Sequence, residues 1–126
     1  MQSRTATPIL ICEDDENLRQ LIRVVIGDGY PVVEAENGDE ALALAREHRP
    51  KLVILDLMLP GISGLDVLRE LRADHGEDGM HVLVMSAWPH AGDAARLAGA
   101  DSFLPKPFEP DHLMEVVKQV LGDPQR

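Results

Sequence analysis

The sequence has little of what disulfide-rich, secreted and membrane-spanning proteins require. Its 126 residues include one cysteine, Cys12, so no disulfide can form within the chain. The longest apolar runs have four or five residues, far fewer than a membrane span needs. The first eight residues, Met1 to Pro8, lack the apolar core of a signal peptide. We therefore expect a cytoplasmic protein with no membrane partner, in which Cys12 is a buried thiol without a redox role.

Basic residues are also scarce. The chain has 12 Lys and Arg against 22 Asp and Glu, a formal net charge of -10. A negative chain is repelled by the phosphate backbone, and no cluster of basic residues or helix-turn-helix pattern offsets this. The glycine patterns of dinucleotide and P-loop sites are missing as well. We expect no direct binding of nucleic acid and no nucleotide-binding loop.

What the sequence does contain is four short apolar runs that each stop at a polar residue. The runs are Ile9-Leu10-Ile11-Cys12, Leu52-Val53-Ile54-Leu55, Val82-Leu83-Val84-Met85 and Ser102-Phe103-Leu104-Pro105. They are followed, in order, by Glu13-Asp14-Asp15, Asp56, Ser86 and Lys106. If the runs are neighbouring parallel strands, these polar groups meet at the carboxyl edge of one sheet, where open α/β folds bind ligands.

Segments with helical spacing separate the runs. Apolar residues recur there at intervals of three and four, which predicts helices with one buried face. The predicted faces are Leu18, Leu21, Ile22 and Val25; Ala41, Leu44, Ala45 and His48; Leu65, Leu68 and Leu71; Ala94, Leu97 and Ala98; and Leu113, Val116, Val117 and Val120. Strands that alternate with helices favour a doubly wound α/β fold. The length allows one domain, residues 1–126, with a core of about 8–121.

The first acidic group indicates a metal site. Three adjacent carboxylates, Glu13, Asp14 and Asp15, repel one another unless a cation neutralises them. Magnesium binds oxygen ligands, commonly one or two carboxylates, and Asp14 and Asp56 could supply two. The alternative is that Asp14 or Asp15 caps the helix that carries Leu18, which would explain one acid only.

Asp56 is the candidate nucleophile. It ends an apolar run and is followed by a segment that Pro60, Gly61 and Gly64 shape into a tight loop. A carboxylate beside a metal can attack phosphorus and form an acyl phosphate, while an ammonium disperses the charge on the phosphoryl oxygens. The alternative is an acidic strand end that turns to solvent.

Taken together, these segments resemble the receiver domain of two-component response regulators, over residues 8 to 121. The resemblance rests on four motifs in order: Ile9-Leu10-Ile11-Cys12-Glu13-Asp14-Asp15-Glu16; Leu55-Asp56-Leu57-Met58-Leu59-Pro60-Gly61 through Gly64; Met85-Ser86-Ala87; and Gly99-Ala100-Asp101-Ser102-Phe103-Leu104-Pro105-Lys106-Pro107-Phe108. The family fold is a flavodoxin-like five-stranded parallel sheet in the order 2-1-3-4-5, with helices on both faces.

The resemblance implies roles for the acids. Asp56 would receive a phosphoryl group from a phosphohistidine on a histidine kinase or histidine phosphotransfer protein. The cofactor would be Mg²⁺, bound directly by Asp14 and Asp56, through water by Glu13, and by the backbone carbonyl of Met58.

It also implies a switch. Ser86 matches the hydroxyl that turns toward the phosphoryl group, Lys106 the lysine that contacts its oxygens, and Phe103 the aromatic ring that follows the hydroxyl. The bond between Lys106 and Pro107 should be cis. The surface of the fourth helix, fifth strand and fifth helix would then signal to an output partner.

Two other functions remain open. A magnesium phosphatase of the haloacid dehalogenase type also has a nucleophilic Asp at a strand end, but it needs a second acid two residues later, where this chain has Met58. A docking module that is never phosphorylated would not need Glu13, Asp14, Asp56, Ser86 and Lys106. We therefore expect a phosphoacceptor that catalyses only its own phosphotransfer and dephosphorylation.

Two flanking features bear on the output. Large apolar residues, Met58 and Trp88, follow Asp56 and Ser86 by two positions and could shield an acyl phosphate from water. The segment from Trp88 to Gly92 resists helix formation, so the fourth helix should begin near Asp93, span about two turns and end near Gly99. Ser102 and the last helix lack the pattern of receivers joined to winged-helix domains, which favours a stand-alone receiver or a different multidomain regulator.

Overall fold

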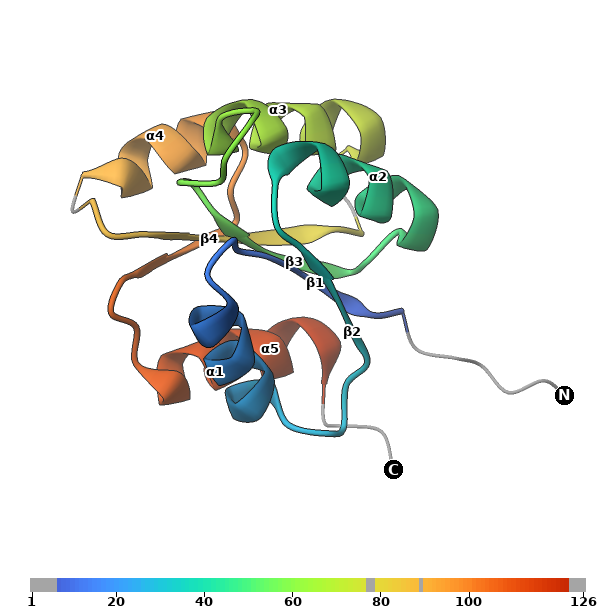
Figure 1. The fold of residues 1–126 in the computed structure, drawn as a ribbon, viewed down its shortest axis with the longest axis vertical. Coiled ribbons are helices and arrows are strands. Elements are labelled where there is room, and N and C mark those ends of the chain that lie inside the picture. Colours follow the sequence, from blue (N-terminus) through green and yellow to red (C-terminus); the bar gives the residue numbers. More distant parts are fainter. Residues whose placement is uncertain (1–6, 77–78, 89, 123–126) are drawn as a thin grey trace, which may run out of the picture.

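The computed structural model describes residues 7–76, 79–88 and 90–122, which form alternating strands and helices (Figure 1). In chain order they are β1 (Ile9–Cys12), α1 (Glu16–Ile26), β2 (Val32–Ala35), α2 (Gly38–His48), β3 (Leu52–Asp56), α3 (Gly64–His75), β4 (His81–Ser86), α4 (Ala91–Ala98), β5 (Ser102–Pro105) and α5 (Pro110–Leu121). The predicted alternation of strand and helix is therefore confirmed.

The strands form one parallel sheet in the order β2-β1-β3-β4-β5, as the resemblance implied. The register pairs Cys12 of β1 with Leu55 of β3, and Asp56 of β3 with Met85 of β4. The carboxyl ends of β1, β3 and β4 consequently lie level with one another. This edge of the sheet carries the polar residues that follow the apolar runs.

Helices cover both faces of the sheet (Figure 1): α2, α3 and α4 lie on one face, and α1 and α5 on the other. Alternate strand residues point to opposite faces, so Leu10 and Val53 belong to the core under α2 and α3, whereas Ile11 and Ile54 face α1 and α5. All are fully buried. Burial on both faces explains why the strands read as continuous apolar runs.

Two of the predicted helix faces need correction. On α1, Ile22 and Ile26 are buried, but Leu21 is exposed. On α4 the buried residues are Ala91 and Ala95, and Leu97 is 91% exposed. Of the predicted face Ala94, Leu97 and Ala98, only Ala98 packs against the core, and Ala94 and Leu97 are exposed.

Helix α4 has the predicted length and begins slightly earlier than Asp93. It runs from Ala91 to Ala98, eight residues, and ends before Gly99. It begins two residues before Asp93, which lies in its first turn, so the predicted start near Asp93 holds to within two residues. Burial of Ala91 against the core offsets the weak helix propensity of Gly92. Across the described segments, none of the helices has the length and apolar character needed to cross a membrane.

Candidate functional site

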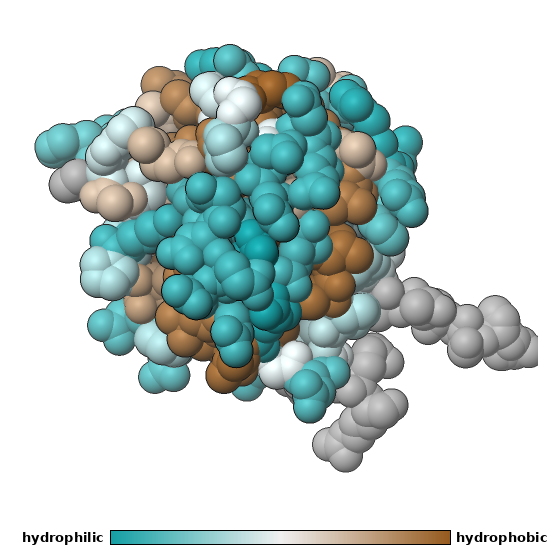
Figure 2. Space-filling view, in the orientation of Figure 1, coloured by the Kyte–Doolittle hydropathy of each residue, from teal (hydrophilic) through white to brown (hydrophobic). Residues whose placement is uncertain are grey.

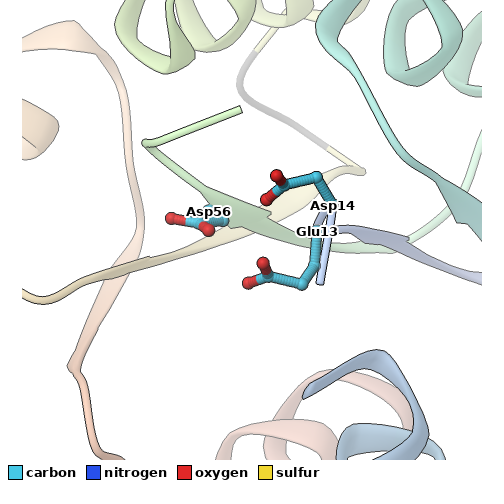
Figure 3. A group of neighbouring side chains, drawn as sticks. All are labelled: Glu13, Asp14 and Asp56. Carbon is cyan, nitrogen blue, oxygen red and sulfur yellow. The ribbon is translucent and has the colours of Figure 1, made fainter. Parts of the chain in front are cut away.

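Three carboxylates converge at the carboxyl edge of the sheet (Figure 3). Glu13 and Asp14 follow β1, and Asp56 ends β3. One oxygen from each lies within 4.8 Å of the others, a spacing that a single metal ion could bridge. Glu13 and Asp56 are each 2% exposed, whereas Asp14 is exposed. The site therefore has a buried floor of two acids and one acid at its open side.

Lys106 joins the two buried acids. Its ammonium nitrogen donates hydrogen bonds to Oε1 of Glu13 at 3.0 Å and to Oδ2 of Asp56 at 2.9 Å. Lys106 follows β5, and its backbone N–H donates to the carbonyl of Ser86 at 2.9 Å. The peptide bond to Pro107 is cis. The four strand ends thus bring together an acid pair and a cation far apart in sequence.

Burial and mutual contact shift the pKa values of Glu13 and Lys106. Burial raises the pKa of Glu13 to about 7, and the neighbouring Asp56 carboxylate adds to the rise, while hydrogen bonds from the Asp15 N–H and from Lys106 oppose it. For Lys106, burial alone would lower the pKa, but hydrogen bonds to Asp56 and Glu13 outweigh it and raise the pKa. Lys106 therefore keeps its positive charge beside the acids.

The loop after Asp56 holds this residue toward the site. The Met58 N–H donates to Oδ1 of Asp56 at 3.0 Å, which leaves Oδ2 for Lys106. At Gly64, a Cβ atom would lie 2.4 Å from Cα of Leu57, so only glycine lets α3 begin this close to the loop. That the Met58 carbonyl is a metal ligand stays a prediction.

The alternative role for these acids, capping the helix that carries Leu18, applies to Asp15. Oδ1 of Asp15 accepts a hydrogen bond from the Asn17 N–H at 2.9 Å and caps α1. Asp14, by contrast, makes no side-chain hydrogen bond or ion pair with any residue in 7–76, 79–88 and 90–122. Capping explains Asp15 and leaves Asp14 available to a cation.

The two expected switch residues lie on neighbouring strands. Ser86, fully buried at the end of β4, accepts a hydrogen bond from the Trp88 N–H at 3.0 Å through its hydroxyl. Phe103, in β5, is partly buried against the core beside Gly92 of α4. Trp88 and Met58 are more than half exposed and flank the site. Their backbone N–H groups, which bond to Asp56 and Ser86, place both residues beside the site.

The donor set fits magnesium. Three carboxylates supply hard oxygen ligands, and the exposed Asp14 leaves one side open for water or phosphate oxygens. No histidine or thiol lies in this group of acids, so the softer N and S donors that zinc prefers are missing from it.

An apolar hollow of about 490 Å³ lies beside Lys106. It is formed by the start of α1, the residue after Ser86 and the segment after β5. Its lining residues are Asp15, Asn17, Leu18, Leu21, Ala87, Lys106, Pro107 and Phe108. The exposed position of Leu21, which the helix pattern had assigned to the core, places it on the wall of this hollow.

Sequence reasoning missed two buried or half-buried arginines. Arg19 of α1 donates to the carbonyl of Glu13, and Arg72 of α3 donates to the carbonyls of Met80 and Gly99. On a helix, a charged residue ordinarily indicates the solvated face. Arg19 also pairs with Glu34 of β2, and the sequence shows these two residues only as opposite charges 15 positions apart.

Comparison with known proteins identifies relatives. The model of the family described as "Response regulator receiver domain" matches residues 9–118. The chain is 37% identical over 118 residues to the polar-differentiation response regulator DivK of Brucella anthropi, covering 91% of this chain and 96% of DivK. It is 39% identical over 113 residues to the DNA-binding response regulator MtrA of Mycolicibacterium paratuberculosis, covering 87% of this chain. The match spans 49% of MtrA, about half its length.

Solved structures give the same result. The receiver domain of NtrX from Brucella abortus superposes with a TM-score of 0.81 at 32% identity, covering 90% of this chain and 97% of that one. The receiver domain of the Francisella response regulator 1452 superposes with a TM-score of 0.82 at 26% identity, covering 90% and 95% of the two chains.

Proposed function

Because the chain belongs to the receiver domain family of two-component response regulators, we propose that it accepts a phosphoryl group on Asp56 from a phosphohistidine of a partner protein. The observation that carries this proposal is the double hydrogen bond of Lys106, which ties the nucleophile Asp56 to Glu13 in a buried site. A histidine kinase or a histidine phosphotransfer protein is the proposed donor.

The proposed transfer needs no further catalytic residue. An oxygen of Asp56 attacks phosphorus, the bond from phosphorus to the imidazole nitrogen breaks, and its electron pair remains on the histidine of the donor. Lys106 stays within reach of the new phosphoryl oxygens because it already lies 2.9 Å from Asp56. Its positive charge would disperse the charge that develops on them.

Glu13, Asp14 and Asp56 would hold the magnesium ion. Bound there, magnesium would neutralise charge on the acids and on the phosphoryl oxygens. The chain's own contribution is to gather the three acids and to keep two of them out of bulk water.

The proposed signal leaves through α4, β5 and α5. Among the described residues, the Ser86 hydroxyl oxygen bonds only to the Trp88 N–H, as an acceptor, so its O–H is available to donate to a phosphoryl group on Asp56. Phe103 borders the backbone of Gly92, where no side chain obstructs a change of rotamer. Movement of the two would alter the surface of α4 and β5, where an output partner would bind.

The hollow beside Lys106 and the net charge of the chain indicate which partners it could bind. The hollow beside Lys106 lies next to Asp56 and suits an apolar side chain of the donor that delivers its phosphohistidine. The net charge of -10 supports the absence of direct nucleic-acid binding. We also propose that the chain acts in the cytoplasm and has no membrane partner.

The chain would act as a switch and not as a turnover enzyme. The position two residues after Asp56 holds Met58, which cannot serve as a general acid. Met58 and Trp88, at the two sides of the site, would slow the attack of water on the acyl phosphate.

Incubation with acetyl phosphate tests the proposal. Intact-mass analysis should show one added phosphoryl group with magnesium and none with excess EDTA. Asp56→Asn should abolish the addition, and the matched control Asp28→Asn, at an exposed acid far from the acid trio, should keep it. Phosphorylation of Asp56→Asn to the parental level would refute the assignment. Sustained hydrolysis of a phosphomonoester would favour a phosphatase instead.

A further inference from the structure

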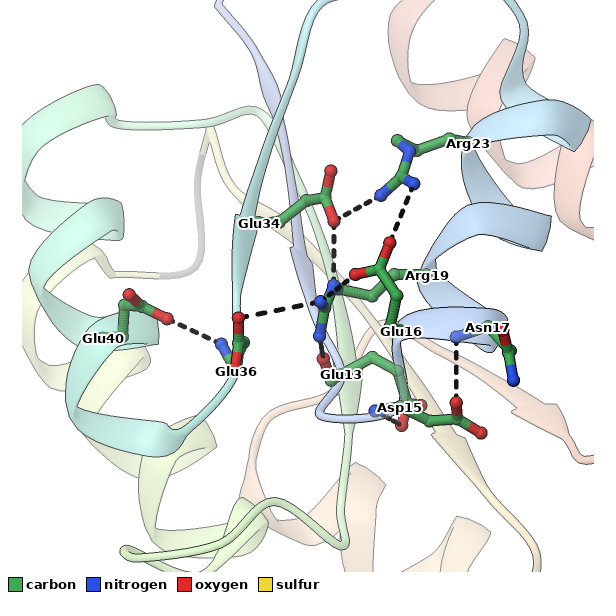
Figure 4. A network of polar contacts seen from close by, with 9 residues as sticks. All are labelled: Glu13, Asp15, Glu16, Asn17, Arg19, Arg23, Glu34, Glu36 and Glu40. Carbon is green, nitrogen blue, oxygen red and sulfur yellow. Dashed lines mark hydrogen bonds and ion pairs between the residues drawn. The ribbon is translucent and has the colours of Figure 1, made fainter.

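Arg19 is a buried cation whose guanidinium contacts the backbone of Glu13, one of the three acids of the site (Figure 4). It lies on α1 and is 5% exposed, which is unusual for arginine unless its donors are all engaged. Figure 2 shows that hydrophilic residues gather over this front of the molecule, where α1 and the edge strand β2 lie. From this side of the molecule, the Arg19 side chain reaches inward to Glu13, at the end of β1.

Each nitrogen of the guanidinium serves a different segment. One donates to the backbone carbonyl of Glu13 at 2.6 Å, and Nε donates to Oε1 of Glu34 in β2 at 2.8 Å. The third contacts Glu16 at the start of α1, with Glu36 at 3.7 Å. Arg19 therefore joins the end of β1 to β2 and to α1. A lysine has no such fork.

The contact with Glu13 fixes the peptide group that carries the metal-site acids. On one side, the Glu13 N–H donates to the carbonyl of Ala35 at 3.0 Å. On the other, its carbonyl accepts from Arg19. The bond from Arg19 restrains the peptide between Glu13 and Asp14, and the Asp15 N–H donates to Oε2 of Glu13 at 3.1 Å. No described residue bonds to the Asp14 side chain, so the backbone at this peptide is what directs it.

We propose that Arg19 is a positioning residue for the magnesium site: by holding the Glu13 carbonyl, it directs the carboxylates of Glu13 and Asp14 at the metal. The inference rests on the proposed function, because it concerns the same site. Arg19 does not touch the acid oxygens that would bind the ion, so it acts through the backbone.

The two possible roles of Arg19, as a positive charge and as a positioning residue, predict opposite effects of its removal on magnesium binding. As a charge, Arg19 repels a divalent cation, although Glu16, Glu34 and Glu36 around it offset this. Removing the charge would then tighten the binding of magnesium. If Arg19 acts by position, its removal weakens binding, as the loss of residues that orient metal ligands commonly does. The sign of the change separates the two roles.

Arg23 provides the matched control. It lies one helical turn further along α1 and shares Glu34 at 2.5 Å and Glu16 at 3.4 Å, but it has no contact with Glu13. Arg23→Gln thus removes the same charge from the same network without releasing the Glu13 carbonyl.

Magnesium titration, followed by the fluorescence of Trp88, the single tryptophan of the chain, gives the first readout. Arg19→Gln should bind magnesium about tenfold more weakly than the parent. Arg23→Gln should bind as the parent does or more tightly. Arg19→Lys, which keeps the charge and favours a folded protein, should also bind more weakly. Equal or tighter binding by both Arg19 variants would overturn the proposal.

Hydrogen exchange in EDTA gives a second readout that does not depend on metal. The Asp15 amide should exchange faster in Arg19→Gln and Arg19→Lys than in the parent, because the Glu13–Asp14 peptide is released. In Arg23→Gln it should exchange at the parental rate. A parental rate in both Arg19 variants would refute positioning. If the parent binds no magnesium, the proposed function fails, and the exchange rates still decide the role of Arg19.

Discussion

The ammonium group of Lys106 lies 2.9 Å from Oδ2 of Asp56, although the two residues are 50 positions apart in the chain. The same nitrogen contacts Glu13 at 3.0 Å. In the absence of metal, Lys106 is thus the cation that keeps two buried carboxylates together. Its role in stability is testable separately from its role in phosphotransfer.

Lys106→Met should lower the free energy of unfolding by about 2 kcal/mol in EDTA, because it leaves Glu13 and Asp56 buried without their cation. The loss should stay below that of a fully buried pair, since the Lys106 side chain is 21% exposed. Magnesium should narrow the gap by replacing the missing charge. Urea denaturation with and without magnesium measures both effects, and exposed Lys51→Gln is the control. A gap that magnesium leaves unchanged would contradict the metal site.

Asp14→Asn should lose most of the rise in Tm that magnesium gives the parent, because it removes a ligand carboxylate. In EDTA its Tm should equal or exceed that of the parent, since the Asp14 carboxylate bonds to no other residue in the described part of the chain and like-charge repulsion falls. Asp15→Asn removes the same charge one residue further on and keeps the cap of α1. Thermal unfolding of the three proteins decides. Equal magnesium shifts in both variants would remove Asp14 from the ligand set.

The sequence predicts the strands well, and it also singles out residues that the structure brings together at one edge of the sheet, because both depend on local patterns. Runs such as Leu52–Leu55 are buried on two faces, so their composition alone reveals them. The polar residue marks the strand end in each case: β1 and β5 end just before it, and β3 and β4 end on it. Arg19 and Arg72 escape this reasoning. Their partners are backbone carbonyls and acids of other elements, and only the packing of α1 against β2, or of α3 against α4, brings them together.

Helix α4 shows a second limit. Local propensity at Gly92 places its start about two residues late, because burial of Ala91 and Ala95 stabilises a first turn that propensity disfavours. Tertiary packing also decides which side of the helix is buried. Leu97, the most apolar residue of the segment, remains in solvent.

Gly64→Ala should destabilise the fold more than Gly61→Ala. A Cβ at Gly64 would lie 2.4 Å from Cα of Leu57 and 2.6 Å from its carbonyl oxygen, so backbone must move, at a cost of about 1 to 3 kcal/mol. At Gly61 the space is open, and only the positive φ of 85° opposes a side chain, which costs about 1 kcal/mol. Urea denaturation ranks the two. Equal losses would show that the loop after Asp56 yields easily.

The stability of the fold should fall in acid partly through His81. Burial lowers the pKa of His81 below its usual 6.5, although Asp101 opposes this. The unfolded chain then binds more protons, so the penalty is absent well above pH 6.5 and grows as the pH falls through that value. In His81→Gln, whose amide can still bond to the Ser102 hydroxyl, the loss between pH 7.5 and pH 5.5 should be smaller. Identical pH slopes in urea denaturation would exclude His81.

The two glycines at the ends of α4 should respond to alanine with opposite signs. At Gly92, an added Cβ would meet the ring of Phe103 at 3.5 Å, an ordinary contact. Alanine there also favours the helix, so Gly92→Ala should raise the free energy of unfolding by about 1 kcal/mol and slow hydrogen exchange in α4. At Gly99, φ is +115°, and a Cβ would lie 2.6 Å from Cγ of Arg72, whose side chain holds the Gly99 carbonyl at 2.7 Å.

Gly99→Ala should therefore lower the free energy of unfolding by more than 1 kcal/mol, through backbone strain and displacement of Arg72. If Phe103 turns on phosphorylation, the methyl group of Gly92→Ala should also oppose that movement, because it occupies space beside the ring. Phosphorylated Gly92→Ala should then show a smaller change in hydrogen exchange across α4 and β5 than the phosphorylated parent. A full change in the stabilised variant would mean that Phe103 moves without crossing Gly92, and that α4 is not what restrains it.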